Sequence, residues 1–316
     1  MKTIITGAGG FVGRNLLKGL PRRGEILALD RAEGLEEFVS RHGLDHVQVR
    51  RGDMGEAGWL RQVACEWGEE ADAVVYLAGN GDPAWSVAHP VEDLRDGALA
   101  LVNFFSTFRA RRAVYFSSGA VYDGLSGSVS PSIRLDPKLP YAIGKLASEQ
   151  YVKFFQKHDR IDEYVVLRFF GAYGPFEPPR KIYTRLVTTF AIERRPDFSI
   201  RGDGRNLIDA MFIEDTVRAV EAVLKGRPKN LVMDFCAGIP YTIRELVVET
   251  ARIFGIDARI TMEGEVPEYI EFRPSPAAMK EMFGFIPAVP LEEGMKILAR
   301  HLQDETGSGR QTEGKR

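Results

Sequence analysis

Short apolar runs alternate with amphipathic stretches along the first half of the chain. Runs rich in β-branched and aromatic residues predict strands over residues 2–6, 25–30, 47–50, 73–78, 113–118 and 164–170. Apolar positions that recur every three or four residues predict helices over residues 11–19, 91–109 and 141–157. Strands that alternate with helices build a parallel sheet with helices on both faces, so this half predicts a doubly wound α/β fold.

The pattern loosens after residue 171, where a stretch rich in glycine and proline begins. A helix is predicted over residues 182–193, and a strand that leads into a helix over residues 211–226. One more strand is predicted over residues 231–238. We expect these last two segments to return to the large sheet.

This pattern divides the chain into two domains and a tail. Residues 1–171 form the large domain, to which residues 205–238 return. Residues 172–204 and 239–302 form a smaller, discontinuous domain. Residues 303–316 are polar and without aliphatic anchors, so we expect a disordered tail.

Charge and cysteine content narrow the classes of function. The formal net charge of the 316 residues is -2, which offers no basic stripe to a nucleic acid. Apolar runs stop short of the roughly 20 residues that a membrane helix needs, so no membrane partner is expected. Cys65 and Cys236 lie far apart without a metal-ligand spacing, so we expect no disulfide framework, no metal site and a cytoplasmic location.

The segment TGAGGFVG, residues 6–13, joins the first predicted strand to the first predicted helix. Gly7 permits a tight turn, Gly10 lets backbone N–H groups approach a pyrophosphate, and Gly13 lets the helix pack close to the sheet. A purely structural turn would use the same glycines. Asp30, however, ends the second strand and can accept hydrogen bonds from both ribose hydroxyls, so the context predicts a dinucleotide site.

Asp30 also bears on which dinucleotide is bound. Its carboxylate would repel a 2′-phosphate, so NAD is preferred over NADP unless Arg31 swings in to compensate. Asp53 and Met54 follow the third strand, where an acid can meet the adenine edge. An acid that caps the next segment would look the same from sequence, and both interpretations stay open.

Residues 117–124, SSGAVYDG, lie at the carboxyl end of the fifth strand, where doubly wound sheets bind ligands. YAIGK, residues 141–145, then opens a helix and places Tyr141 and Lys145 on one face. An unperturbed tyrosine has a pKa of about 10, which an adjacent lysine and a positively charged nicotinamide would both lower. Such a pair alone is more often a surface feature. Together with the glycine loop and Ser118, it predicts that Tyr141 is a general acid or base.

These motifs, in this order, resemble the NAD-dependent epimerase/dehydratase family, the extended short-chain dehydrogenases that act on nucleotide sugars. Further landmarks are the segment LAG at 77–79, RFFGAYGP at 168–175, and GDG followed by MFIEDTVRA. The resemblance covers the chain to about residue 300. It implies a Rossmann domain followed by a substrate domain, bound NAD, a nucleotide-sugar substrate and a homodimer formed through helices 91–109 and 141–157, the first with Leu99, Val102 and Phe105 on its apolar side.

The resemblance also implies a role for each matched residue. Ser118 hydrogen-bonds the reacting sugar oxygen, Tyr141 is the acid/base, and Lys145 binds the nicotinamide ribose. The implied cofactor contacts are Gly7, Gly10, Phe11, Val12, Gly13, Asp30, Arg31, Asp53, Met54, Leu77, Ala78, Gly79, Ser117, Tyr141 and Lys145. The expected substrate contacts are Ser118, Gly119, Ala120, Tyr141, Gly171, Tyr173, Arg180, Arg205 and Arg273. The arginines are candidate diphosphate ligands because guanidinium groups suit phosphate oxygens, and only Arg273 lies near the position of a phosphate ligand in the family.

The chain departs from the family pattern at positions that bear on the reaction. Dehydratases of the family carry Asp-Glu after the catalytic Thr, where this chain has Gly119 and Ala120. Neither residue can transfer a proton, so dehydration is disfavoured. Gly171 stands where many relatives have Asn, and Ile208 where they have Arg, so the substrate contacts are rearranged.

Three hypotheses follow. The first is a nucleotide-sugar 4-epimerase that works through a transient 4-keto intermediate. The second is a 4-keto-sugar reductase or sugar dehydrogenase that exchanges its cofactor at every turnover. The third is a non-catalytic NAD-binding regulator, which the intact Ser118, Tyr141 and Lys145 argue against.

Overall fold

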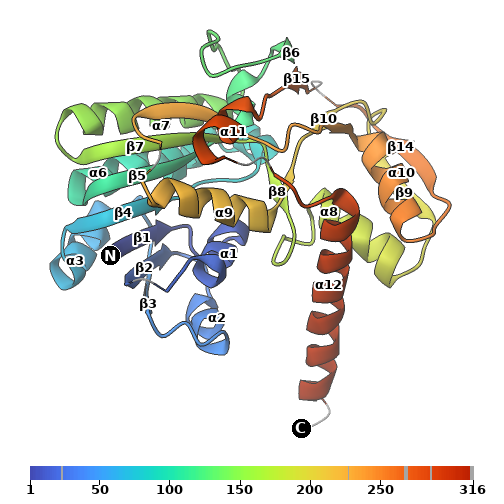
Figure 1. The fold of residues 1–316 in the computed structure, drawn as a ribbon, viewed down its shortest axis with the longest axis horizontal. Coiled ribbons are helices and arrows are strands. Elements are labelled where there is room, and N and C mark those ends of the chain that lie inside the picture. Colours follow the sequence, from blue (N-terminus) through green and yellow to red (C-terminus); the bar gives the residue numbers. More distant parts are fainter. Residues whose placement is uncertain (23, 227, 267–269, 285–286, 314–316) are drawn as a thin grey trace.

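The computed structural model describes residues 1–22, 24–226, 228–266, 270–284 and 287–313. Within them, seven strands form one sheet in the order β12-β7-β5-β4-β1-β2-β3, and every pairing is parallel (Figure 1). The strands are β1 Lys2–Thr6, β2 Glu25–Asp30, β3 Val47–Arg51, β4 Glu70–Tyr76, β5 Arg109–Ser118, β7 Ile161–Phe169 and β12 Leu231–Phe235. All six strands expected from the first half are present.

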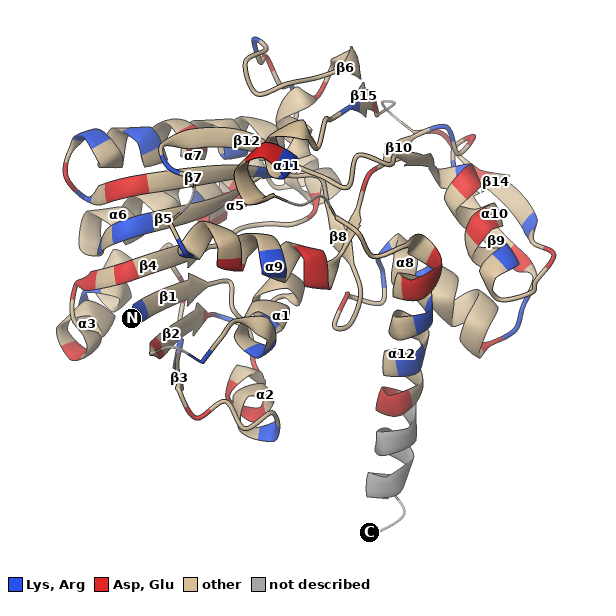
Figure 2. Cartoon of the chain, viewed as in Figure 1, with Lys and Arg blue, Asp and Glu red and all other residues tan. Residues whose placement is uncertain are grey.

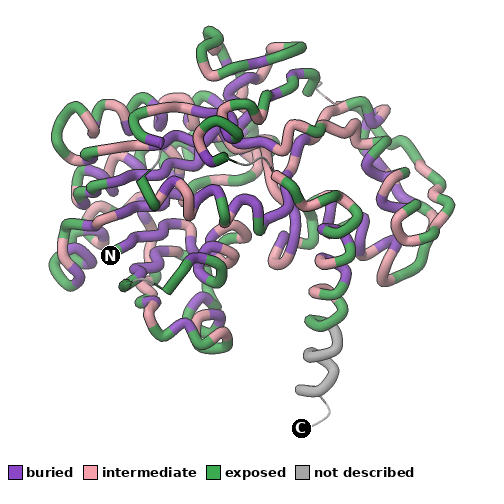
Figure 3. The backbone as a smooth tube through the Cα atoms, in the orientation of Figure 1, coloured by how far each residue is buried: buried purple, intermediate pink, exposed green. Residues whose placement is uncertain are grey.

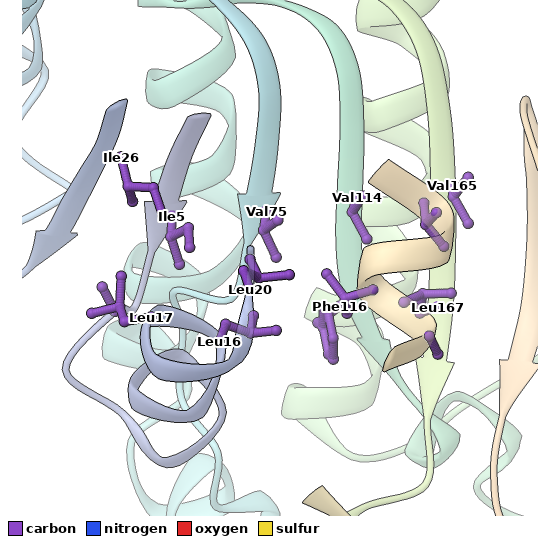
Figure 4. Close-up of a cluster of buried hydrophobic side chains, with 14 of the residues drawn as sticks. Ile5, Leu16, Leu17, Leu20, Ile26, Val75, Val114, Phe116, Val165 and Leu167 are labelled. Atoms are coloured by element: carbon purple, nitrogen blue, oxygen red, sulfur yellow. The ribbon is translucent and has the colours of Figure 1, made fainter. Parts of the chain in front are cut away.

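Helices cover both faces of this sheet, as expected for a doubly wound fold. One face packs against α1 Phe11–Gly19, α2 Leu35–Arg41, α9 Ile213–Leu224 and α11 Ala277–Phe283. The other packs against α3 Ala57–Trp67, α6 Ala100–Thr107 and α7 Pro140–Lys157. The central strands are buried almost throughout (Figure 3), since side chains on both of their faces meet helices. Figure 4 shows the first of these cores, where Leu16 of α1 lies near Val75 and Phe116 of neighbouring strands.

The expected helix over residues 91–109 is instead divided. It consists of α5 Pro90–Leu94, the π-helical segment η1 Arg95–Leu99 and α6, and is preceded by α4 Pro83–Ala88. The π-helical turn changes which side chains share a face. Phe105 is consequently in the core while Leu99 is exposed, so the expected grouping of Leu99, Val102 and Phe105 on one side is wrong.

The second body of the molecule has its own core around Tyr183, Phe190 and Leu246. It contains α8 Ile182–Val187, the π-helical η3 Thr188–Ile192, the paired strands β9 Asp197–Arg201 and β14 Arg259–Glu263, α10 Ile243–Ile253 and α12 Leu291–Glu313. Both α9 and α12 carry charges of both signs (Figure 2). The capping box of Thr242 and Glu245 begins α10.

Short strand pairs connect distant segments. They are β8 Ala172–Tyr173 with β11 Met211–Phe212, β10 Leu207–Ile208 with β13 Tyr241–Thr242, and β6 Ser126–Ser128 with β15 Glu271–Arg273. A single 3-10 turn, η2 Gly119–Tyr122, follows β5. The expected return to the large sheet therefore holds for β12 but is wrong for β11, which pairs with β8.

The expectation of a disordered tail over residues 303–316 stays a prediction, although helix α12 includes part of this segment. Helix α12 begins at Leu291 and continues to Glu313. Its buried residues Met295, Leu298 and Ala299 fix the first turns on the second core, and no proline interrupts the residues that follow. Residues 314–316 lie outside the described part.

Candidate active site

The glycine loop brings three segments of backbone into close approach. Gly7 has φ of 67°, and a Cβ on it would lie 2.9 Å from the backbone nitrogen of Ala78. A Cβ on Gly13 would lie 2.5 Å from the carbonyl oxygen of Gly7. Gly10 donates its N–H to that same oxygen at 3.1 Å, which closes the turn ahead of α1. Only glycine fits at these positions, and the loop is held against the end of β4.

A cavity of about 280 Å³ opens beside this loop at the carboxyl ends of the strands. Its lining is Gly7, Gly9, Gly10, Asp30, Arg31, Ala32, Gly52, Asp53, Met54, Leu77, Ala78, Gly79 and Asp96. Asp30 is held by its two neighbours, because Oδ2 accepts the N–H of Gly9 at 2.7 Å and Oδ1 accepts that of Ala32 at 2.8 Å. A carboxylate has lone pairs left for further donors. The glycine-rich backbone, the Asp30 carboxylate and the apolar walls of this cavity fit a dinucleotide.

Most of the expected cofactor residues line this cavity, with six exceptions: Tyr141 and Lys145 border the small cavity next to it, and the other four lie elsewhere. Phe11 and Val12 pack into the hydrophobic cores from α1, and Gly13 lies against the loop backbone. Ser117 is buried and donates to Glu149 instead. Sequence reasoning missed Gly9, Ala32, Gly52 and Asp96, of which the first three flank predicted residues.

Both interpretations of Asp53 have support. Its Oδ1 accepts the N–H of Gly55 at 2.8 Å, which holds the turn ahead of α3, although the N-cap residue of that helix is Glu56. The same side chain also lines the cavity, beside Met54.

Ser118, Tyr141 and Lys145 come together at the edge of this cavity. Ser118 ends β5, and Lys145 lies one helical turn after Tyr141 at the start of α7. Ser118 hydrogen-bonds the Tyr141 side chain. Lys145 Nζ lies 5.7 Å from the centre of the Tyr141 ring and donates to the Phe116 carbonyl at 2.9 Å. Tyr141 and Lys145 also border a small cavity with Ala78 and Gly79, so the candidate catalytic groups adjoin the dinucleotide cleft.

The expected lowering of the tyrosine pKa is wrong for the protein alone. Burial raises the pKa of Tyr141, the hydrogen bond from Ser118 opposes that change, and the negative charge of Asp93 adds to it. Burial also lowers the pKa of Lys145 to about 8, although the carboxylates of Asp93 and Glu149 oppose this. Desolvation is the largest cause of both pKa shifts.

A buried polar network, which sequence analysis did not find, lies beneath the catalytic residues. Arg168 of β7 donates through Nε and Nη2 to the two carboxylate oxygens of Glu149 on α7, at 3.0 and 2.9 Å. Glu149 also accepts from Ser117 at 2.6 Å. Arg168 donates to the Tyr122 hydroxyl at 3.0 Å, which donates to Asp234 at 2.6 Å. This network ties the helix that carries Tyr141 to three strands of the main sheet.

The expected substrate residues do not form one group. Gly119 and Ala120 lie in η2, directly after Ser118, and Gly171 follows β7 with φ of 121°. Tyr173 is wrongly placed at the sugar by the sequence, because it stacks on Tyr183 in the second core, with ring centres 4.4 Å apart.

The three arginines are exposed on separate segments. Arg180 precedes α8, Arg273 is in β15, and Arg205 pairs with Asp203 at 2.6 Å.

Two further features are negative over the described residues. None of the helices is long and apolar enough to span a membrane. No group of three His, Cys, Asp or Glu side chains is placed to hold a metal ion.

Known proteins with similar sequences and folds agree with this geometry. The family model for the NAD dependent epimerase/dehydratase family matches residues 3–233. YtcB of Bacillus subtilis (strain 168), named as an uncharacterized UDP-glucose epimerase, is 27% identical over 240 residues, which cover 72% of this chain and 73% of YtcB. A dTDP-glucose 4,6-dehydratase of Streptomyces griseus is 26% identical over 312 residues, covering 92% of this chain and 91% of its own.

A solved structure shows the same fold over nearly the whole chain. The UDP-glucose 4-epimerase of Thermotoga maritima, crystallised with UDP-glucose, superposes with a TM-score of 0.86 at 22% identity, covering 97% of this chain and 100% of its own. The matched residues include the glycine loop, Asp30 at the end of β2 and the Ser118–Tyr141–Lys145 group. This chain is an NAD-dependent enzyme that belongs to the NAD dependent epimerase/dehydratase family.

Proposed function

We propose that the enzyme is a nucleotide-sugar 4-epimerase that keeps its NAD bound through a transient 4-keto intermediate. The observation that carries the proposal is the Ser118–Tyr141–Lys145 group at the edge of the dinucleotide cleft, where the two residues that follow Ser118, Gly119 and Ala120, are neither acids nor bases. The relatives named above as UDP-glucose epimerases support this reaction class.

Each of the three side chains has a distinct task in this reaction. NAD, when bound, supplies the hydride acceptor and returns the hydride. Tyr141 acts as a base in its phenolate form, which the positive charges of Lys145 and of bound NAD⁺ would favour against the effect of burial. The phenolate accepts the proton of the sugar C4 hydroxyl and gives it back to the keto oxygen after the ketone has rotated. Ser118 holds that oxygen by a hydrogen bond. Lys145, with a pKa of about 8, is mostly protonated at neutral pH and favours the phenolate electrostatically.

The region after Ser118 argues against dehydration. A Cβ on Gly119 would lie 2.7 Å from Cδ1 of Phe170, so an Asp at this position would not fit without movement of that ring. Ala120 offers only a methyl group. Elimination of water needs an acid and a base at the sugar, and these two positions supply neither.

Exposed apolar residues support a homodimer, which we also propose. Val91 and Leu94 of α5, Leu99 of η1, and Ile143 and Phe154 of α7 are all exposed. A cluster of this kind is costly in a monomer and is typical of a protein interface. Light scattering at micromolar concentration should give twice the 35.3 kDa chain mass, and the monomer mass would contradict the proposal.

The two free cysteines, Cys65 and Cys236, support a cytoplasmic location.

The first experiment incubates the purified protein with UDP-, GDP-, CDP- and dTDP-sugars without added cofactor and follows the products by proton NMR. Inversion at C4 without a net absorbance change at 340 nm is the expected result. Turnover that starts only when NAD(P)H and a 4-keto sugar are supplied would instead establish the reductase.

The Tyr141→Phe variant tests the assigned base. It should lose turnover by at least about 100-fold while its cofactor stays bound, since it removes only the proton-transferring hydroxyl. Unchanged turnover would overturn the mechanism.

A further inference from the structure

A cluster of ion pairs lies along the side of the cofactor cleft formed by β2, β3 and η1. Arg31, directly after β2, places Nη1 2.8 Å from Oδ2 of Asp96. Arg95 donates to the other oxygen of Asp96 from Nε at 3.0 Å and from Nη2 at 2.9 Å. Asp53 lies farther off, 4.0 Å from Arg31 and 3.9 Å from Arg95. Asp96 therefore has both oxygens engaged by arginines.

The local backbone explains how Asp96 reaches this place. It lies in η1, the π-helical turn between α5 and α6, and such turns often mark functional sites. The side chain of Asp96 is only 7% exposed and lines the cleft, whereas that of Arg31 is 59% exposed. A buried carboxylate thus holds the guanidinium of an exposed arginine.

The position of Arg31 matters because of its neighbour Asp30. Asp30 lines the same cleft and is oriented by the N–H groups of Gly9 and Ala32. Arg31 is the cation closest to it along the chain, and a guanidinium in this position could neutralise a 2′-phosphate on the adenosine ribose. In the structure that guanidinium is paired with Asp96 instead.

We propose that Asp96 is a positioning residue for cofactor selection, which holds Arg31 on the η1 side of the cleft and so keeps it from a 2′-phosphate beside Asp30. NAD selectivity then has two parts. Asp30 repels the extra phosphate, and Asp96 occupies the cation that would otherwise attract it.

Binding of NAD⁺ and NADP⁺ to the nucleotide-free full-length protein, measured by titration calorimetry, tests this role. In Asp96→Asn, the ratio of the NADP⁺ to the NAD⁺ dissociation constant should fall by about fivefold, the factor that one partly exposed ion pair provides. Loss of any negative charge would also favour NADP⁺, so two comparisons separate the explanations. Glu92→Gln removes an exposed carboxylate near Arg95 and should leave the ratio unchanged.

The second comparison is a double-mutant cycle with Arg31. In the Arg31→Ala background, Asp96→Asn should no longer change the ratio. A change of equal size in both backgrounds would show a general charge effect and overturn the proposal. Arg31→Ala alone offers a check that does not depend on the folding of an Asp96 variant. If this single change weakens NADP⁺ binding relative to NAD⁺, Arg31 already reaches the phosphate and the proposal fails.

Discussion

Replacement of Arg168 by methionine should destabilise the protein strongly at neutral pH and much less in weak acid. The side chain of Glu149 is fully buried and that of Arg168 is 5% exposed. Without the guanidinium, the Glu149 carboxylate keeps the hydrogen bond from the Ser117 hydroxyl at 2.6 Å. Removal of one member of a buried ion pair costs about 3–5 kcal/mol, because the other charge stays behind without a partner. Methionine fills most of the volume of the arginine stem, so the cavity adds little.

The orphaned carboxyl group can escape this cost by taking up a proton. An ordinary glutamate has a pKa of about 4.3, so holding one neutral costs about 3.7 kcal/mol at pH 7 and about 1 kcal/mol at pH 5. In this variant the folded state binds more protons than the unfolded state, so its stability falls as pH rises. The expected loss in the free energy of unfolding is therefore about 4 kcal/mol at pH 7 and about 1 kcal/mol at pH 5.

Urea denaturation at the two pH values, followed by circular dichroism, measures both losses. Arg109→Met is the matched control, because Arg109 makes an exposed pair with Asp162 at 3.3 Å and should cost less than about 1 kcal/mol. A loss below 1 kcal/mol for Arg168→Met at pH 7, or an equal loss at both pH values, would refute the reasoning. The double variant Arg168→Met with Glu149→Met should regain most of the stability, since it leaves no buried charge from this pair.

Three other changes test separate parts of the site. Gly119→Ala should cost about 1–3 kcal/mol in urea denaturation, because its Cβ would approach the Phe170 ring at 2.7 Å. Burial raises the pKa of Glu177 from 4.5 to about 7, so the protonated form stabilises the fold in acid and this stabilisation is lost as pH rises through 7. The free energy of unfolding should therefore fall between pH 5 and 8 by up to about 3 kcal/mol less in Glu177→Gln than in the unmodified protein. Identical pH profiles for the two proteins would contradict the raised pKa of Glu177. Asp30→Ala should narrow the preference for NAD⁺ over NADP⁺ by about tenfold in titration calorimetry, whereas an unchanged ratio would leave Asp30 without its selective role.

Features set by local sequence were predicted well. The strands of the main sheet and helices α1 and α7 follow from short apolar patterns, and the glycine loop follows from its place between β1 and α1. Parallel strands deliver their carboxyl ends to one edge of a sheet. Residues such as Asp30 and Ala78 could therefore be assigned to one cleft before their distances were known.

Features that depend on partners far along the chain were missed. Ser117 looked like a cofactor contact because it precedes Ser118, yet its partner is Glu149, 32 residues away. The Tyr122–Asp234 bond joins residues 112 positions apart. Asp96 was hidden because an apolar pattern does not distinguish a π-helical turn from an α-helix.

The substrate side of the site shows this limit most clearly. The loop after β5 is held by β6, which pairs with β15, and the segment after β7 is held by β8, which pairs with β11. Such a pairing sets the position of Tyr173. This residue lies in β8 beside Phe212, and its side chain packs into the second core. Arg273 is placed by its register with Ser128. A short strand gains its position only from its partner. The segments in which we expect substrate contacts are therefore positioned by pairings that no local pattern contains, whereas the residues around the dinucleotide cleft are positioned by the strand order of the main sheet.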